Sequence, residues 1–251
     1  MAQLRPVTLS IAGLDPCSGA GLIADIKTFE ANKVYGLAVP SCITYQHDLL
    51  FKKTEWIPVV KIIEQIDLLK ERFNIRFVKI GLIENLQVLD HLLNYLNASI
   101  TAPVIIWDPV LKASAGYTFH SQPDRSLIEH LCKKIYLLTP NLPEAILLGN
   151  DDDAIENARK LSQYCHVYLK GGHCEKKKGK DYLFTKEKKE FSFNPSQNNV
   201  SQKHGSGCVL STAITANLAK KTTLHSACLR AKNYTASFLS SNTSLLGYHK
   251  L

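Results

Sequence analysis

Short, continuously apolar segments alternate with amphipathic segments along most of this chain. In the amphipathic segments the apolar residues return every three or four positions, which predicts helices with one buried face. The continuous apolar segments are typical of strands that are covered on both faces. The predicted strands are 6–12, 38–44, 76–80, 103–107, 135–138 and 166–170, with hairpin strands at 182–184 and 190–193.

The predicted helices separate these strands at regular intervals. This rhythm predicts an α/β fold of three αβα layers, in which helices flank both faces of a mostly parallel central sheet. No low-complexity linker or internal repeat interrupts the chain, so we expect one domain over residues 1–251. The predicted helices are 21–32, 59–73, 85–97, 121–133, 143–148, 151–164, 207–220 and 224–240.

Polar residues and glycines follow the end of each predicted parallel strand. Ligands of open α/β sheets bind beyond the carboxyl ends of the strands, so these clusters predict one shared site. Helix starts and turns would explain any single cluster equally well. The six clusters are 13–15, Tyr45-Gln46, Gly81, Asp108-Pro109, 139–141 and 171–173.

The glycine-rich segment 203–208, KHGSGC, leads directly into an apolar helix. Free backbone N–H groups and the positive end of a helix dipole make such a junction an anion site. The same position is expected to lower the pKa of the thiol of Cys208. A phosphate cradle and a potential base are therefore predicted within a few residues of each other.

Composition narrows the class of protein. The 251 residues are 45% hydrophobic and carry a formal charge of +8, which suits small anionic ligands. Seven cysteines without CxxC pairing indicate a reduced, cytoplasmic protein, and no membrane span or secretory leader is expected. The lysine-rich segment 175–190 allows nucleic-acid binding as an alternative, but it surrounds DYLF and is typical of a solvated hairpin.

Seven motifs, in order, resemble those of the hydroxymethylpyrimidine and phosphomethylpyrimidine kinases of thiamine biosynthesis, which have the ribokinase-like fold. The resemblance extends from the first strand to about residue 240. It implies ATP-dependent phosphorylation of 4-amino-5-hydroxymethyl-2-methylpyrimidine, and then of its monophosphate, with Mg²⁺ as cofactor. The motifs are TLSIAGLDPCSGAGLIADIKTFEANKVYG, ITYQHD, KIGLIEN, DPVLKASAGY, LLTPNLPEAILL, LKGGH and HGSGCVLSTAI.

The resemblance implies that Cys208 is the base that receives the substrate's hydroxyl proton. The backbone N–H groups of Gly205, Ser206, Gly207 and Cys208 would then stabilise the transferring phosphoryl group. A small buried core residue is the alternative interpretation of this cysteine.

For the nucleotide, the resemblance implies contacts from Asn141, Glu144, Lys170, Gly172 and Ser206. Glu144 and Asp108 would organise Mg²⁺, Glu144 through water. Asn141 and Glu144 also fit the start of a helix, and Asp108 fits an ordinary strand-end aspartate.

For the pyrimidine, the resemblance implies that Gln46 binds the aminopyrimidine edge, because a carboxamide offers a donor and an acceptor together. Asp25 would lie near the hydroxymethyl group, although a capping or i,i+4 partner of a lysine is an equal alternative. The remaining predicted pocket residues are Gly13, Ala20, Gly81 and Val110.

The chain departs from the family pattern in two places. The first loop reads DPCSGAG, and residues 114–116 replace a lysine-serine-glycine, with Lys112 as a possible substitute. If the family lysine contacts phosphate, its replacement bears on the second phosphorylation, whose substrate is already anionic. Alternatives are a pyridoxal or pyridoxine kinase of the same fold and a non-catalytic ligand sensor. The resemblance also implies a homodimer.

Overall fold

The computed structural model describes residues 4–111, 124–149, 151–172, 179–196 and 200–250. A single sheet of nine strands, in the order β3-β2-β1-β4-β5-β6-β7-β8-β9, runs through this part of the chain. Its strands are β1 Val7–Leu14, β2 Tyr35–His47, β3 Leu50–Trp56, β4 Phe77–Ile80, β5 Val104–Trp107, β6 Leu137–Leu138, β7 His166–Leu169, β8 Asp181–Phe184 and β9 Glu190–Phe193.

The centre of the sheet is parallel and both of its edges are antiparallel. β2, β1, β4, β5, β6 and β7 pair in parallel, whereas β3 and the β8–β9 hairpin pair antiparallel at the two ends. Successive side chains of β5 enter opposite cores: Ile105 and Trp107 pack in one, and Ile106 in the other. Burial on both faces is why the parallel strands read as unbroken apolar segments.

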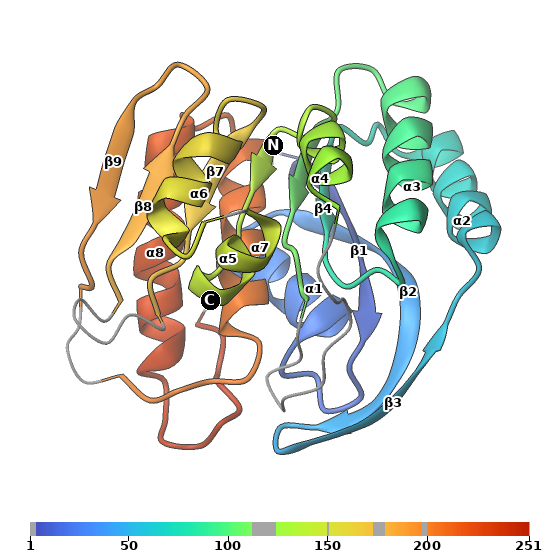
Figure 1. Ribbon diagram of the computed structural model, residues 1–251. Helices are drawn as coiled ribbons and strands as arrows, with labels where there is room; N and C mark the ends of the chain where they lie inside the picture. Colours follow the sequence, from blue (N-terminus) through green and yellow to red (C-terminus); the bar gives the residue numbers. More distant parts are fainter. Residues whose placement is uncertain (1–3, 112–123, 150, 173–178, 197–199, 251) are drawn as a thin grey trace.

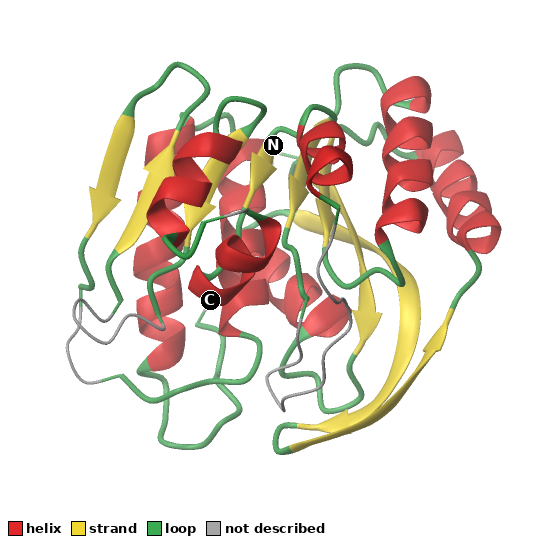
Figure 2. Cartoon of the chain, viewed as in Figure 1, coloured by secondary structure: helices red, strands yellow, loops and turns green. Residues whose placement is uncertain are grey.

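Helices cover both faces of the sheet, which confirms the predicted three layers (Figure 1, Figure 2). α7 and α8 pack together over the core that contains Ile106, and α1 contacts α7. α2 to α6 supply the opposite core. The helices are α1 Gly21–Ala31, α2 Val59–Arg72, α3 Leu86–Ser99, α4 Arg125–Cys132, α5 Leu142–Leu148, α6 Ala154–Leu161, α7 Ser206–Ala219 and α8 Leu224–Leu239.

The sequence-based prediction missed β3 and ended β2 too early. β2 continues through Tyr45 and Gln46 to His47 and turns directly into β3, and the two strands curve away together (Figure 1). Gln46 therefore lies within a hairpin strand, where it pairs with Phe51, and not in a loop after a strand. β3 escaped detection because it is an edge strand whose residues are exposed or half-buried, with lysines and a glutamate that hide the alternation.

The remaining predictions of strands agree with the structure to within a few residues. The predicted hairpin is present as β8–β9, but β9 extends beyond the lysine-rich segment, and β8 is buried and not solvated. Among the described residues, no helix is both long and apolar enough to cross a membrane.

Candidate functional site

The N-terminus of α7 meets the first glycine-rich loop. Gly205 caps the helix with a left-handed backbone (φ 74°), and a Cβ there would lie 2.1 Å from the carbonyl oxygen of Gly19. It would also lie 2.6 Å from the Cα of Ala20. Only glycine satisfies both the conformation and the contact. The two loops predicted to hold phosphate and substrate are therefore in direct contact.

Asp15 and His204 fasten these two loops together. The carboxylate of Asp15 accepts hydrogen bonds from the backbone N–H groups of Cys17, Gly19 and Ala20, and it lies 3.0 Å from Nε2 of His204. Burial alone would raise the pKa of Asp15, but the hydrogen bonds from His204, Cys17 and Ala20 outweigh burial and lower it. Asp15, which belongs to the predicted cluster 13–15 but was given no role of its own, thus shapes the loop.

Cys208 occupies the first turn of α7 and is only half-buried. Its sulfur interacts with the backbone N–H of Gly21, across the junction of the loops. Burial raises the pKa of the thiol to about 11; the charge of Lys79 and the Gly21 N–H oppose this rise, and Asp108 and Asp25 add to it. The expectation of a lowered pKa is wrong, because desolvation and two carboxylates outweigh the charge of Lys79 and the hydrogen bond from Gly21.

Asp108, Lys170 and Glu144 form a buried charged cluster at the ends of β5 and β7 and the start of α5. Nζ of Lys170 donates to Oδ1 of Asp108 at 2.7 Å and lies 3.8 Å from Oε2 of Glu144. Thr139 and Ser211 donate to Asp108 as well, so both of its oxygens have partners inside the protein. Asp108 is thus more than an ordinary strand-end residue: it fixes the lysine.

Charges within this cluster shift its acids in opposite directions. Burial would raise the pKa of Asp108, but Lys170 and Lys79 outweigh it and lower the pKa. For Glu144, burial dominates the attraction of Lys170, and the charge of Asp108 adds to burial, so its pKa rises to about 7. Glu144 is therefore the acid of the cluster that changes charge near neutral pH.

The helix start at Asn141 is a complete capping box. The side chain of Asn141 accepts from the backbone N–H of Glu144 at 2.9 Å, and Glu144 accepts from the backbone N–H of Asn141 at 2.8 Å. Lys170 lies beside this turn, because its backbone bridges to Asn141. A Cβ on Gly207 would be 3.3 Å from Nζ of Lys170, so the ammonium group also faces the start of α7. Asn141, Glu144, Lys170 and Gly207 are thus brought together.

Asp25 is fully buried and has a partner that the sequence-based analysis missed. Lys79, in the middle of β4, donates to its Oδ2 at 2.8 Å, and neither side chain has any exposed surface. Ser10 and Thr212 donate to the same carboxylate. All of these contacts are internal, so Asp25 does not offer a free oxygen to a substrate alcohol. A lysine inside the apolar segment FVKIG was the available signal.

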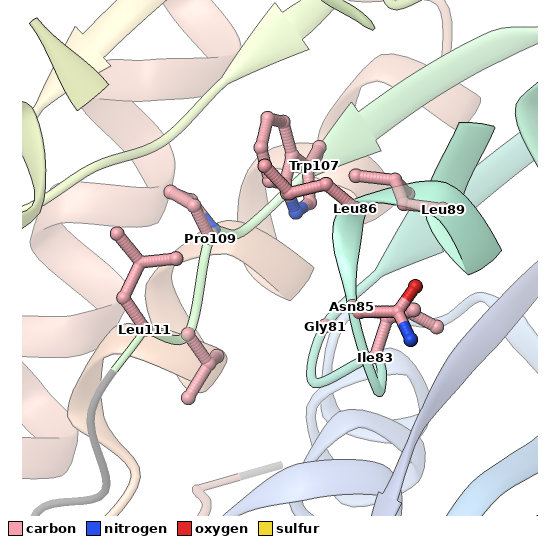
Figure 3. A pocket seen from close by; sticks show the side chains of 9 residues that line it. Gly81, Ile83, Asn85, Leu86, Leu89, Trp107, Pro109 and Leu111 are labelled. Atoms are coloured by element: carbon pink, nitrogen blue, oxygen red, sulfur yellow. The ribbon is translucent and has the colours of Figure 1, made fainter. Parts of the chain in front are cut away.

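Gly81 and Val110 line one small pocket between α3 and the segment after β5 (Figure 3). Trp107 and Leu86 supply much of its apolar wall. A Cβ on Gly81 would lie 2.9 Å from Nζ of Lys79, which places the end of β4 next to the buried ion pair. Gly81 and Val110, two of the residues predicted to bind the pyrimidine, therefore line the same pocket.

The other predicted residues lie around this centre. A Cβ on Gly13 would lie 2.8 Å from the sulfur of Cys42 on β2, so β1 and β2 approach closely there. Gln46 is half-buried, two residues beyond Thr44, whose hydroxyl donates to the carbonyl of Leu14. A Cβ on Gly172 would meet nothing within 4 Å, so this glycine faces open space. His173, Lys112 and residues 114–116 lie outside the described residues.

The sequence and the fold both match known proteins. The sequence model of the phosphomethylpyrimidine kinase family matches residues 15–250. A hydroxymethylpyrimidine/phosphomethylpyrimidine kinase of Haemophilus influenzae is 31% identical, over 96% of this chain and 93% of its own. A phosphomethylpyrimidine kinase of Clostridium difficile has a TM-score of 0.76 at 30% identity, covering 93% of this chain and 99% of the other.

A second group of solved structures has the same fold. The pyridoxal kinase of Bacillus subtilis, solved as an ADP complex, has a TM-score of 0.81 at 25% identity, covering 96% of this chain and 94% of the other. The site described above therefore lies in a fold that pyrimidine and pyridoxal kinases share.

Proposed function

Because this chain belongs to the phosphomethylpyrimidine kinase family, we propose that its site transfers the terminal phosphoryl group of ATP to 4-amino-5-hydroxymethyl-2-methylpyrimidine and then to the monophosphate. The single observation that carries this proposal is the contact between the two glycine loops at Gly205 and Gly19, with Cys208 and Lys170 beside it. This arrangement combines an anion-binding helix start, a cation and a potential base. Those are the groups that phosphoryl transfer requires.

Cys208 is proposed as the base for the substrate hydroxyl. The O–H proton passes to the sulfur as the oxygen forms its bond to phosphorus and the bond to the leaving nucleotide diphosphate breaks. With its pKa near 11, the thiol accepts a proton only through its minor thiolate form. Turnover should therefore rise with pH across the range in which the protein stays folded, by up to tenfold for each pH unit.

The phosphate groups are proposed to lie between the start of α7 and Lys170. The backbone N–H of Gly207 lies in the first turn, where N–H groups lack intrahelical partners, and that of Ser206 makes only a long hydrogen bond of 3.4 Å to the carbonyl of Lys203. The ammonium of Lys170 faces the same point. Gly172, in open space after β7, leaves room for the nucleotide.

The charged cluster fits a hydrated Mg²⁺ better than a directly bound one. Both oxygens of Asp108 already accept hydrogen bonds, and Lys170 stands between Asp108 and Glu144. Mg²⁺ keeps several waters, so Glu144 and Asp108 would hold it through water. When bound with the nucleotide, the ion would supply positive charge to the phosphates. Glu144 must be ionised for this, which its pKa of about 7 permits above neutral pH.

The pyrimidine is proposed to bind between the first loop, the end of β4 and the β2–β3 hairpin. Gly13, Ala20, Gly81 and Val110 would surround the ring, and Gln46 would reach it from the hairpin. Asp25 takes no direct part, since its oxygens bind Ser10, Lys79 and Thr212. We also propose that the chain is one domain and works in the cytoplasm, as its uninterrupted pattern and its cysteines indicate, and that it assembles as a homodimer, as the resemblance implies.

The decisive experiment supplies purified protein with ATP, Mg²⁺ and each pyrimidine substrate, and separates mono- and diphosphate products by anion-exchange chromatography. Cys208→Ser should lower kcat by about 10²–10⁴ and change KM little, as expected for loss of a base. Cys17→Ser, at a half-buried thiol in the adjacent loop, is the matched control and should retain activity. Near-normal turnover in Cys208→Ser would remove the base from the proposal.

A pyridoxal kinase activity is the second candidate, because the fold also matches the Bacillus subtilis pyridoxal kinase. The same assay with pyridoxal in place of the pyrimidine separates the two. A kcat/KM for pyridoxal above that for the pyrimidine would reverse the assignment of substrate. Formation of monophosphate without diphosphate would limit the activity to the first step.

A further inference from the structure

The buried ion pair between Lys79 and Asp25 has no structural need to be charged. Both side chains have no exposed surface, and removing two charges from water costs several kcal/mol for each ion. Apolar residues of similar volume often stabilise such a position as well or better. A charged pair between β4 and α1 therefore calls for a reason other than stability.

The position of the pair relative to α7 suggests that reason. Thr212, which donates to Oδ1 of Asp25 at 2.6 Å, lies one helical turn beyond Cys208 and on the same side of α7. Nζ of Lys79 lies at the end of β4, where a Cβ on Gly81 would be 2.9 Å away. The pair thus lies between Gly81, which lines the pocket of Figure 3, and the turn of α7 that follows Cys208.

We propose that the buried ammonium of Lys79 is a positioning residue that stabilises the thiolate form of Cys208, while Asp25 holds that ammonium in place and limits its effect. A role of Lys79 in catalysis rests on the proposed role of Cys208 as the base. The effect of Lys79 on the thiolate of Cys208 does not depend on the substrate.

Four charged side chains surround the thiol, and Lys79 acts on it most strongly. Asp25 from α1, Asp108 after β5 and Lys170 after β7 are the others. Among the influences on the pKa of Cys208, Lys79 is the largest that favours the thiolate, ahead of the opposing effects of Asp108 and Asp25. The charges of Asp25, Cys208 and Asp108 in turn outweigh burial and raise the pKa of Lys79, so its charge persists.

The test measures how fast Cys208 reacts with iodoacetamide as a function of pH. The thiolate attacks the methylene carbon, a C–S bond forms and iodide leaves, so the rate reports the thiolate fraction. Cys17 and Cys174 are first replaced by serine, and the peptide that carries Cys208 is quantified by mass spectrometry. No turnover is needed, so failure of this inference and failure of the proposed function are distinguishable.

Three isosteric variants should separate in rate in a fixed order. Asp25→Asn removes a carboxylate that disfavours the thiolate, while Asp108 and the thiolate itself still favour the charged form of Lys79, so this variant should react severalfold faster than the parent. Lys79→Met leaves the carboxylate alone and should react about tenfold slower. The double variant Asp25→Asn/Lys79→Met removes both charges and should fall between the parent and Lys79→Met, because Lys79 has the stronger effect on the thiol.

A merely structural pair would give a different result. Loosened packing would expose Cys208 and accelerate alkylation in all three variants, and that outcome would overturn the proposal. Unchanged rates in all three would do the same. Lys79→Met is the variant at risk of unfolding, and the double variant then carries the test alone, since it leaves no unpaired charge. Lys232→Met on α8, which breaks the largely buried pair with Asp181 on β8, is the control and should leave the alkylation rate unchanged.

If Cys208 is the base, the variants should show the same order in the pH dependence of kcat. The pH profile of kcat should then shift along the pH axis in each variant by the shift seen in alkylation, with KM for the pyrimidine unchanged. Alkylation rates in the predicted order with an unshifted kcat profile would keep Lys79 as the group that stabilises the thiolate and would reject Cys208 as the base.

Discussion

Two buried lysine–aspartate pairs flank the first turn of α7, and they differ in access. The Lys79–Asp25 pair has no exposed surface, whereas Lys170 keeps 11% of its side chain exposed and faces the helix start and Glu144. We propose that the Lys170–Asp108 pair, the open pair, exchanges its internal partner for a ligand. The Lys79–Asp25 pair, the closed pair, would act on a ligand only through its electric field. On this proposal, solvent access decides the role of each pair.

Removing one charge of the closed pair is expected to have the largest effect on stability. Lys79→Met should lower the free energy of unfolding by about 3–5 kcal/mol, because it leaves the carboxylate of Asp25 buried and unpaired. Urea denaturation of the parent and the variant measures this. The double variant Asp25→Asn/Lys79→Met should recover most of the loss. A double variant as unstable as Lys79→Met would mean that packing, and not charge, is responsible.

Removing the cation of the open pair should affect catalysis first. Lys170→Met should lower kcat/KM by about 10²–10³, the loss typical of a group that stabilises charge developing in the transition state. Steady-state kinetics with ATP as the varied substrate gives this value. We expect a smaller loss of stability than for Lys79→Met, because water reaches the open pair. The reverse ranking in both measurements would contradict the distinction between the pairs.

The pH dependence of the unfolding free energy tests the raised pKa of Glu144, which lies beside the open pair. Its folded pKa of about 7 lies above its ordinary value, so its contribution to stability is fully present below about pH 4.5 and is lost as the pH rises to about 7. The loss amounts to about 3 kcal/mol. The difference in unfolding free energy between the parent and Glu144→Gln, measured by urea denaturation across this range, should change by that amount. A difference that is independent of pH would contradict the raised pKa.

A solvent-exposed ion pair serves as the control for the two buried pairs. Lys53 and Glu55, 2.8 Å apart on β3, are both more than half exposed. Lys53→Met should change neither the urea midpoint nor kcat/KM measurably, since solvent screens such pairs. A clear loss of activity would show that the β2–β3 hairpin takes a more direct part in the site than its packing indicates.

Local patterns in the sequence predicted several parts of the site correctly. Asn141 and Glu144 form the capping box that NLPE implies, and the glycine turn before α7 places Cys208 on the first helical turn. The alternation of strands and helices predicted the parallel core of the sheet. Each of these features depends on residues within a few positions of one another, where spacing alone fixes the geometry.

Other parts depended on contacts between distant segments. Lys79 and Asp25 are 54 positions apart, and only the pairing of β1 with β4 and the packing of α1 bring them together. The raised pKa of Cys208 likewise comes from carboxylates on other elements and from burial. β3 was missed because an edge strand lacks the apolar signal of the core.

The sequence by itself determined the family, the two glycine loops and the succession of elements apart from β3, because hydrophobic periodicity and backbone freedom are local properties. The tertiary structure decided which charged groups are closed off from solvent and which are open, and hence which acids and thiols are ionised. Solvation and Coulomb interactions depend on distances through space, and these are fixed only when the sheet and its helices have packed.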